Sequence, residues 1–254
     1  MVSGLPVFAQ AFSADRDQYV LIGGGAVHLH LENAGLGARA TKDLDLVLTA
    51  HALDEGFVRR FWTFLITGGY ESWQRGEGEP VRYRFMKPKQ ADYPAMLELL
   101  GRPLGDPPEG QTIAPMPTGE DLSDLSVIVL EPDIFEVVRN QRQVMEGVSC
   151  LSPWGLILLK ARAFIDLSAK RQAGETVRSS DIKKHRNDVF RMAALLASDQ
   201  DLPAPDSTRE TLARFLVSVE AEEDSHPSIL ASLEGLPGGS MVERVQELRA
   251  LAFD

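Results

Sequence analysis

The sequence predicts an α/β protein whose first half combines strands and helices and whose second half is helical. In the first half, short apolar runs, some with alternating polar residues, are separated by turn-like segments with glycine and proline, as expected for β-strands. From residue 151 onward, apolar residues recur at helical spacing instead. We therefore expect an α/β domain over residues 1–135 and a helical domain over residues 136–254.

The expected elements follow from these patterns in chain order. The apolar run Tyr19–Ile22 predicts a strand, which a glycine turn (Gly23–Gly25) and a short helix (Ala26–Asn33) follow. A second strand carries Asp43 and Asp45. Beyond it we expect a helix over 53–69, strands over Tyr70–Trp73, Val81–Met86, Ala95–Leu100 and Leu125–Leu130, a proline-rich loop over 101–120, and helices over 154–170, 181–198, 208–223 and 241–253.

The composition is that of an ordinary globular protein, with 44% hydrophobic and 25% charged residues. No apolar run approaches the roughly 18–20 residues that span a bilayer, and the N-terminus lacks the pattern of a signal peptide. The single cysteine excludes an internal disulfide. We expect a cytoplasmic protein with no membrane partner.

The net charge of −11 argues against a surface that binds nucleic acid over its whole extent. The charge is unevenly distributed, however, because residues 170–191 contain seven basic and three acidic side chains, whereas residues 199–254 contain twelve acids and four arginines. A basic patch in an acidic protein suits a phosphate-bearing substrate. A solvated helix face with ion pairs would have the same composition.

The strongest chemical signal is the pair Asp43 and Asp45. In a strand, side chains two residues apart project from the same face, about 7 Å apart. Two such carboxylates repel each other unless a cation lies between them, and Mg²⁺ binds carboxylates together with phosphate oxygens. The turn at Gly24 and Gly25 would supply backbone N–H groups for those phosphates. The alternative is a strand whose acids simply face water.

The segments GGGAVHLHL and RATKDLDLVL together resemble the signature of the nucleotidyltransferase superfamily, in which a Gly-Gly or Gly-Ser turn precedes an Asp-x-Asp pair. They are most similar to the AbiEii-type nucleotidyltransferases, the toxin half of type IV toxin–antitoxin pairs. The resemblance covers most of residues 15–196. It implies a nucleotidyltransferase-type mixed sheet with flanking helices, followed by a helical half. The implied reaction is Mg²⁺-dependent transfer of a nucleoside monophosphate from an NTP to a hydroxyl of tRNA or protein. It also implies a cognate antitoxin as partner.

The resemblance assigns roles within the α/β domain. Asp43 and Asp45 would hold the metal, with Glu98 on a neighbouring strand as the third ligand in place of the commoner aspartate. Gly24 and Gly25 would bind the triphosphate. Arg39 and Lys42 lie in the loop that enters the metal strand, where they would meet phosphates or remain solvated. A solvent-facing strand residue is the alternative for Glu98.

In the helical half, the resemblance implies that Lys160 contacts the phosphates of the nucleotide. The later segment Lys184-His185-Arg186-Asn187-Asp188 matches a family pattern in which Lys184 binds nucleotide and Asp188 positions Lys160 or acts as a base toward the acceptor. The alternatives are a lysine that extends its ammonium to water and an i, i+4 salt bridge between Lys184 and Asp188.

Other sites are poorly supported. The glycine turn lacks the last glycine of a dinucleotide-binding fingerprint, and there is no Walker A, G-x-S-x-G or C-x-x-C motif. His28 and His30 would point in different directions on a helix, which makes them poor joint zinc ligands. Two other functions remain open. The protein could be a nucleotidyltransferase that modifies a small molecule such as an antibiotic, or a non-catalytic member of the fold that binds a nucleotide or a partner protein.

Overall fold

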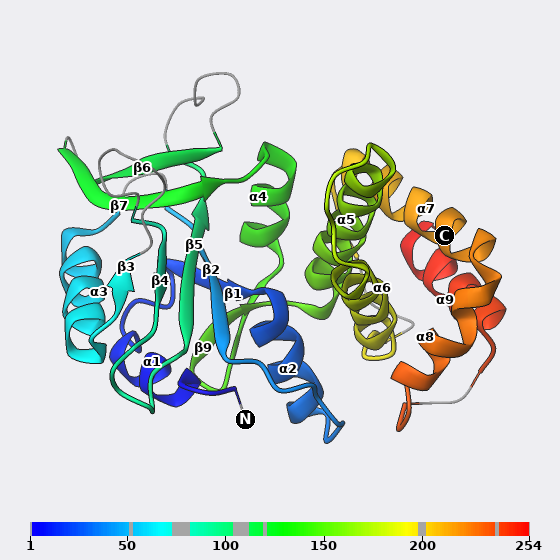
Figure 1. Ribbon diagram of the computed structural model, residues 1–254, viewed down its shortest axis with the longest axis horizontal. Coiled ribbons are helices and arrows are strands. Elements are labelled where there is room, and N and C mark those ends of the chain that lie inside the picture. The colour runs from blue at the N-terminus through cyan, green and yellow to red at the C-terminus, as the bar shows by residue number, and fades with distance from the viewer. Residues whose placement is uncertain are drawn as a thin grey trace. The chain divides into compact units, whose positions relative to one another are not determined.

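In the computed structural model, the chain folds into two compact units (Figure 1). The first unit contains residues 1–29 and 38–151, and the second contains residues 30–37 and 152–254. The described residues are 2–50, 53–72, 82–103, 112–118, 121–197, 202–236 and 239–253, with the backbone alone described at 72 and 121–124.

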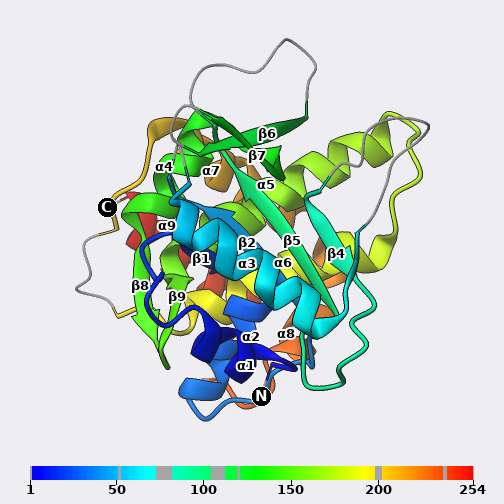
Figure 2. The ribbon, with the colours of Figure 1, turned by 90° about the vertical axis from the view of Figure 1, so that its left-hand side faces the viewer.

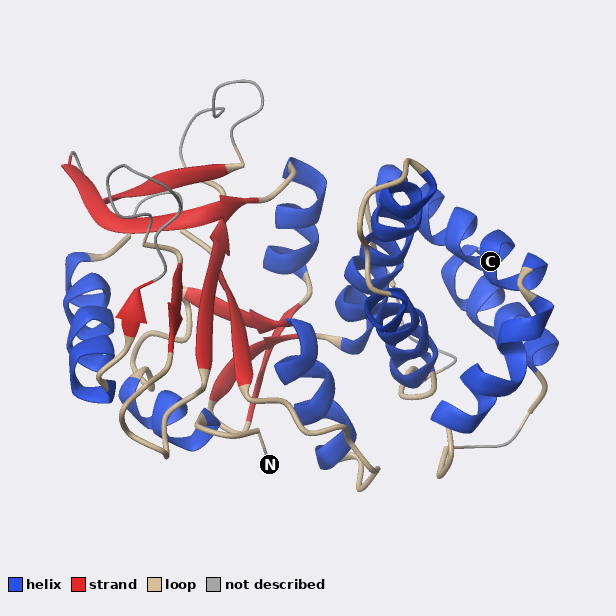
Figure 3. Ribbon diagram, viewed as in Figure 1, coloured by secondary structure: helices blue, strands red, loops and turns tan. Residues whose placement is uncertain are grey.

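The first unit is built on one mixed β-sheet, which has nine strands among the described residues (Figure 3). They are β1 (Tyr19–Ile22), β2 (Asp43–Leu48), β3 (Glu71–Ser72), β4 (Arg84–Met86), β5 (Met96–Gly101), β6 (Ile113–Thr118), β7 (Asp121–Val129), β8 (Arg142–Met145) and β9 (Val148–Leu151). The main path is β3-β4-β5-β2-β1-β9-β8, and β7 joins β6 to β5. Because β2 lies antiparallel to β1 and parallel to β5, the predicted mixed sheet is confirmed.

One face of this sheet carries the apolar core of the first unit. On β2 and β5, the side chains of Leu44, Leu46, Leu97 and Leu99 are at most 1% exposed. Helix α3 (Glu55–Gly68) lies across this face (Figure 2). Rings from α3, from β1 and from α1 (Leu5–Ala11) with its C-cap form a cluster with centroids 4.6–6.3 Å apart, which comprises Phe8, Phe12, Tyr19, Phe57, Phe61 and Phe64. Each fully buried phenyl ring stabilises the fold by about 2–3 kcal/mol.

The opposite face of the same strands is only partly covered. Asp43 is exposed, and Asp45, Met96 and Glu98 are half-buried. Because successive side chains of a strand point to opposite faces, these residues project from the face opposite to the leucines of the core. The candidate site therefore lies on the open face of a sheet that is sealed on its other side.

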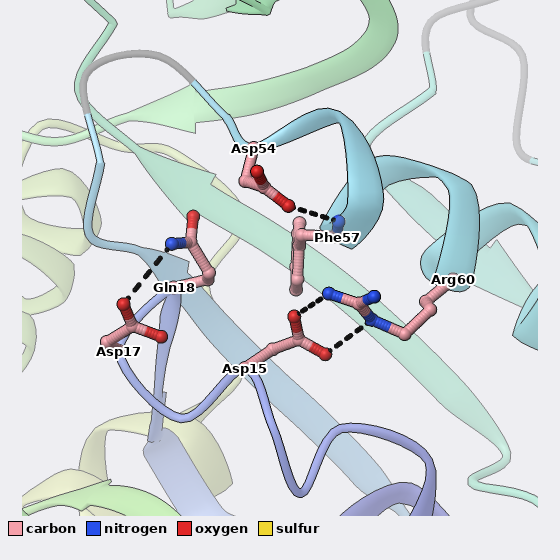
Figure 4. A network of polar contacts seen from close by, with 6 residues as sticks. All are labelled: Asp15, Asp17, Gln18, Asp54, Phe57 and Arg60. Carbon is pink, nitrogen blue, oxygen red and sulfur yellow. Dashed lines mark hydrogen bonds and ion pairs between the residues drawn. The ribbon is translucent and has the colours of Figure 1, made fainter.

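A polar network attaches α3 to the loop before β1 (Figure 4). Asp54 is the N-cap of α3 and accepts a hydrogen bond from the Phe57 N–H at 2.9 Å. Arg60 donates through Nε to Asp15 Oδ2 at 2.7 Å and also contacts the second oxygen of the same carboxylate. Asp15 is 3% exposed, so this bidentate pair neutralises a buried charge.

The structure corrects one prediction in the segment 101–120. Residues Ile113–Thr118, expected within a proline-rich loop, form β6. Pro115 and Pro117 are tolerated because β6 pairs with β7 alone among the described strands, and half of the N–H groups of an edge strand face away from its partner. Residues 104–111 and 119–120 lie outside the described residues, as do Trp73 and Val81 of two other predicted strands.

The first unit extends beyond the sequence-based boundary at residues 135 and 136, which falls inside α4 (Pro132–Asn140). The hairpin of β8 and β9 follows α4, and Cys150 of β9 pairs in parallel with Leu21 of β1. Because this pairing adds the hairpin to the sheet, the unit ends at Leu151.

The second unit is helical, as predicted. Its helices are α5 (Pro153–Gln172), α6 (Ser179–Ala193), α7 (Asp206–Ala221), the short η1 (Glu223–Ser225), α8 (His226–Ser232) and α9 (Met241–Phe253). Ser152 caps α5 by accepting from the Gly155 N–H at 3.2 Å, with Pro153 in the first helical position. Phe164, Phe190 and Phe215 form its aromatic core. Among the described residues, no helix is both long and apolar enough to cross a bilayer.

Candidate active site

Four charged side chains lie on the open face of the sheet, on three adjacent strands. Asp43 and Asp45 are two residues apart on β2. Asp45 is the Cα partner of Glu98 on β5, and Glu98 is the Cα partner of Arg84 on β4. Neighbouring strands are about 4.8 Å apart, so Asp45, Glu98 and Arg84 form a row across the sheet. The pairing of β2 with β5 brings together the three predicted acids.

The glycine turn lies directly against this row. Helix α2 (Gly23–Asn33) begins immediately after β1, three residues before the predicted start at Ala26, so the three glycines form its first turn. Gly23 has φ +66°. A Cβ atom at Gly23 would lie 1.9 Å from Asp45 Oδ2, so no larger residue fits while that carboxylate keeps its place. Gly24 and Gly25 occupy the first turn of α2, where backbone N–H groups have no partner within the helix. The turn therefore combines close backbone approach with a helix N-terminus.

Glu98 is bound by an arginine that the sequence analysis did not identify. Arg84 donates through Nε to Glu98 Oε1 at 2.5 Å, and its Nη2 contacts the same oxygen. The side chains of Arg84 and Glu98 are 32% and 15% exposed. The alternation in VRYRFM indicated a strand at this point, but the register that places Arg84 opposite Glu98 depends on a pairing that local sequence does not specify.

Arg39 and Lys42 are exposed, and their backbones are held in place. The ring Nδ1 of His28 lies 3.0 Å from the Arg39 carbonyl oxygen. Because a carbonyl only accepts, Nδ1 carries the proton. The Ala95 N–H donates to the Lys42 carbonyl at 2.8 Å. The loop is therefore fixed by its backbone, and the phosphate-binding role of the two side chains stays a prediction.

The residues on this face fit a magnesium ion chemically, although they do not form a complete ligand set. Among the described residues, no group of three or more His, Cys, Asp or Glu side chains is arranged to hold a metal ion. Asp43 and Asp45 offer the hard oxygen ligands that Mg²⁺ prefers, and Mg²⁺ commonly takes only one or two protein carboxylates together with waters and phosphate oxygens. Glu98, by contrast, is engaged by Arg84.

In the second unit, the structure brings together two further predicted residues. Lys160 on α5 donates through Nζ to Asp188 Oδ2 on α6 at 2.9 Å, and both side chains are buried. Lys184 lies one turn before Asp188 on α6 and is half-buried. Lys160 therefore does not extend its ammonium to water, because Asp188 compensates its charge within the helical unit.

His185 adjoins this ion pair. Burial, followed by the positive charges of Lys160 and Lys184, lowers the pKa of His185 to about 4, and the nearby Asp188 opposes this shift only in part. Its Nδ1 atom is buried and has no hydrogen-bond partner among the described residues. The imidazole is therefore neutral at pH 7.

Comparison with known proteins gives no family assignment. No family model and no curated protein matches the chain. Among solved structures, the crystal structure of the Megavirus polyadenylate synthase matches with 9% identity and a TM-score of 0.39, over 89% of this chain and 38% of that one. This chain thus spans well under half the length of the synthase. A likeness at this level supports no argument, so the site is interpreted from its own residues.

Proposed function

We propose that the protein is a Mg²⁺-dependent nucleotidyltransferase, which moves a nucleoside monophosphate from an NTP to a hydroxyl. The observation that carries the proposal is the contact between Gly23 and Asp45, with Asp43 two residues away on the same open face. It places backbone N–H groups, which suit phosphate oxygens, beside carboxylates, which suit a divalent cation.

In the proposed reaction, the acceptor hydroxyl oxygen attacks the α-phosphorus of the NTP. The bond from that phosphorus to the oxygen bridging to the β-phosphate breaks, pyrophosphate leaves with the electron pair, and the hydroxyl proton passes to a carboxylate or to water. Asp43 and Asp45 would hold Mg²⁺, which when bound stabilises negative charge on the phosphate oxygens. Gly24 and Gly25 would orient the triphosphate through their backbone N–H groups.

The finer parts of the proposal concern the acceptor and the biological role. The resemblance of the glycine turn and the Asp pair to AbiEii-type proteins supports tRNA or a protein side chain as acceptor, and a toxin controlled by an antitoxin. The phosphate-binding roles of Lys160 and Lys184 and the role of Asp188 as a base are further proposals, to be tested by substitutions in the second unit.

The direct test is transfer of label from NTPs that carry ³²P in the α-phosphate. The protein is incubated with Mg²⁺ and each NTP, together with total RNA or with cell lysate. We expect label in RNA or in protein, and the labelled class identifies the acceptor. Labelling of a small molecule alone would favour the antibiotic-modifying alternative, and no labelling with any NTP would contradict the proposed activity.

The matched variants are Asp43→Asn/Asp45→Asn and Glu71→Gln/Asp92→Asn. Each pair removes two negative charges from the first unit at nearly constant volume. Only the first pair lies next to Gly23. Glu71 is exposed on the same face but three strands away from Asp43, and Asp92 is exposed in a loop. We expect the first pair to lower transfer at least about a hundredfold and the second to leave it unchanged. Equal labelling by both would show that Asp43 and Asp45 do not hold the catalytic metal.

A further inference from the structure

The row Asp45–Glu98–Arg84 indicates a role for Arg84 within the proposed function. Glu98 lies between the other two residues, since it is the Cα partner of both. Its carboxylate contacts Arg84 through one oxygen, which both Nε and Nη2 of the guanidinium approach. The contact holds one edge of the planar guanidinium and thereby fixes its orientation.

The charges on this face also bear on the role of Glu98. Among the described residues of the row and its neighbour Asp43, three carboxylates and one guanidinium leave a formal charge of −2. One divalent ion compensates that charge. A second ion bound through Glu98 would have to displace Arg84 from a charge-assisted hydrogen bond of 2.5 Å.

We propose that Arg84 binds phosphate oxygens of the substrate, and that Glu98 positions Arg84 instead of completing a metal site. A guanidinium presents its N–H donors in a planar fork that matches phosphate oxygens, and about a third of the Arg84 side chain reaches solvent. Arg84 lies two strand spacings from Asp45, roughly 10 Å between Cα atoms, which is within the reach of one bound polyphosphate and one arginine side chain.

The ligand in this inference comes from the proposed function, so the test measures binding separately from transfer. Inorganic tripolyphosphate with Mg²⁺ serves as the phosphate probe, measured by calorimetry. Mn²⁺ alone serves as the metal probe, measured by electron paramagnetic resonance. The variants are Arg84→Gln, Glu98→Gln and their combination. Lys87→Gln is the control, because it removes the same positive charge from a residue that directly follows β4 and whose side chain is 74% exposed.

We expect Arg84→Gln to raise the Kd for Mg²⁺-tripolyphosphate at least about tenfold, with the number of Mn²⁺ ions unchanged. Glu98→Gln should weaken tripolyphosphate binding less and also leave Mn²⁺ binding intact. In the double variant, Glu98→Gln should add nothing to the effect of Arg84→Gln, because Glu98 acts through Arg84. Lys87→Gln should match the unchanged protein. Arg84→Lys keeps the positive charge but lacks the planar guanidinium, so its Kd for Mg²⁺-tripolyphosphate should lie between those of the unchanged protein and Arg84→Gln. It replaces Arg84→Gln if that variant does not fold.

Three results would overturn the inference. Loss of a Mn²⁺ ion in Glu98→Gln would make Glu98 a metal ligand, and an unaltered tripolyphosphate Kd in both Arg84 variants would remove Arg84 from the phosphate site. Failure of the unchanged protein to bind tripolyphosphate would remove the site altogether. The transfer assay then separates the two proposals, since transfer that persists at full rate without Arg84 leaves the proposed function standing.

Discussion

Lys160 and Asp188 form an ion pair of 2.9 Å inside the helical unit, where their side chains are only 4% and 7% exposed. The two residues come from different helices and are 28 positions apart in the chain. Removing one partner would leave the other charge buried without compensation, which is far more costly than losing an exposed pair.

We expect Lys160→Met to lower the free energy of unfolding by about 3–5 kcal/mol. The double variant Lys160→Met/Asp188→Leu should recover most of that loss, because no buried charge remains. Urea unfolding followed by circular dichroism measures both. As a control at a partly exposed pair, Arg162→Met interrupts the i, i+4 contact with Asp166 and should change stability by less than about 1 kcal/mol. Equal stability of the single and double variants would contradict the expectation.

Gly23→Ala tests the contact between the glycine turn and Asp45. Gly35→Ala is the matched control, because Gly35 also has a left-handed backbone (φ +71°) but a Cβ there would meet nothing within 4 Å. Both variants carry the backbone strain of about 1 kcal/mol, and only Gly23→Ala forces the Asp45 carboxylate to move. We expect only Gly23→Ala to reduce Mn²⁺ affinity, by about tenfold or more. The same affinity in both variants would show that the metal does not depend on this contact.

His185 should make stability fall in mild acid. Its pKa is lowered to about 4 in the folded protein, against about 6.5 for an unperturbed histidine. The unfolded chain therefore binds the proton more readily, and stability is lost as pH falls from about 6.5 toward 4. The loss is of the order of 2–3 kcal/mol. His185→Gln should reduce the dependence of the unfolding free energy on pH, measured by urea unfolding between pH 7 and 4. Ring proton resonances of His185 that titrate near pH 6.5 in the folded protein would contradict the lowered pKa.

The Arg60–Asp15 pair should contribute to the stability of the first unit (Figure 4). Arg60→Gln would leave the carboxylate of Asp15 buried with its strongest partner removed. We expect a loss of about 2–3 kcal/mol in thermal or urea unfolding. Arg59→Gln removes the same charge one residue earlier on the helix, away from Asp15, and it should change stability by less than about 0.5 kcal/mol. If the two variants unfold alike, the pair is not a structural anchor.

Local sequence was sufficient to predict the elements that carry the candidate site. A strand was predicted over Asp43 and Asp45, and the apolar run Tyr19–Ile22 predicted β1. The following helix was predicted from Ala26, whereas α2 begins at Gly23 and includes all three glycines. Local sequence failed at β6, where proline counted against a strand that the edge of a sheet tolerates. It also missed Arg84, because the β4–β5 register that places Arg84 beside Glu98 joins segments that no local pattern links.

The unequal faces of β2 have a consequence for how the protein tolerates mutation. Leu44 and Leu46 point into the sealed core, whereas Asp43 and Asp45 point to the open face. Substitutions at successive positions of β2 should therefore cause, in alternation, two different kinds of defect. In a saturation library scored for both cellular abundance and nucleotide transfer, polar replacements of the two leucines should lower the cellular abundance of the protein. Asparagine at the two aspartates should leave abundance intact and abolish transfer.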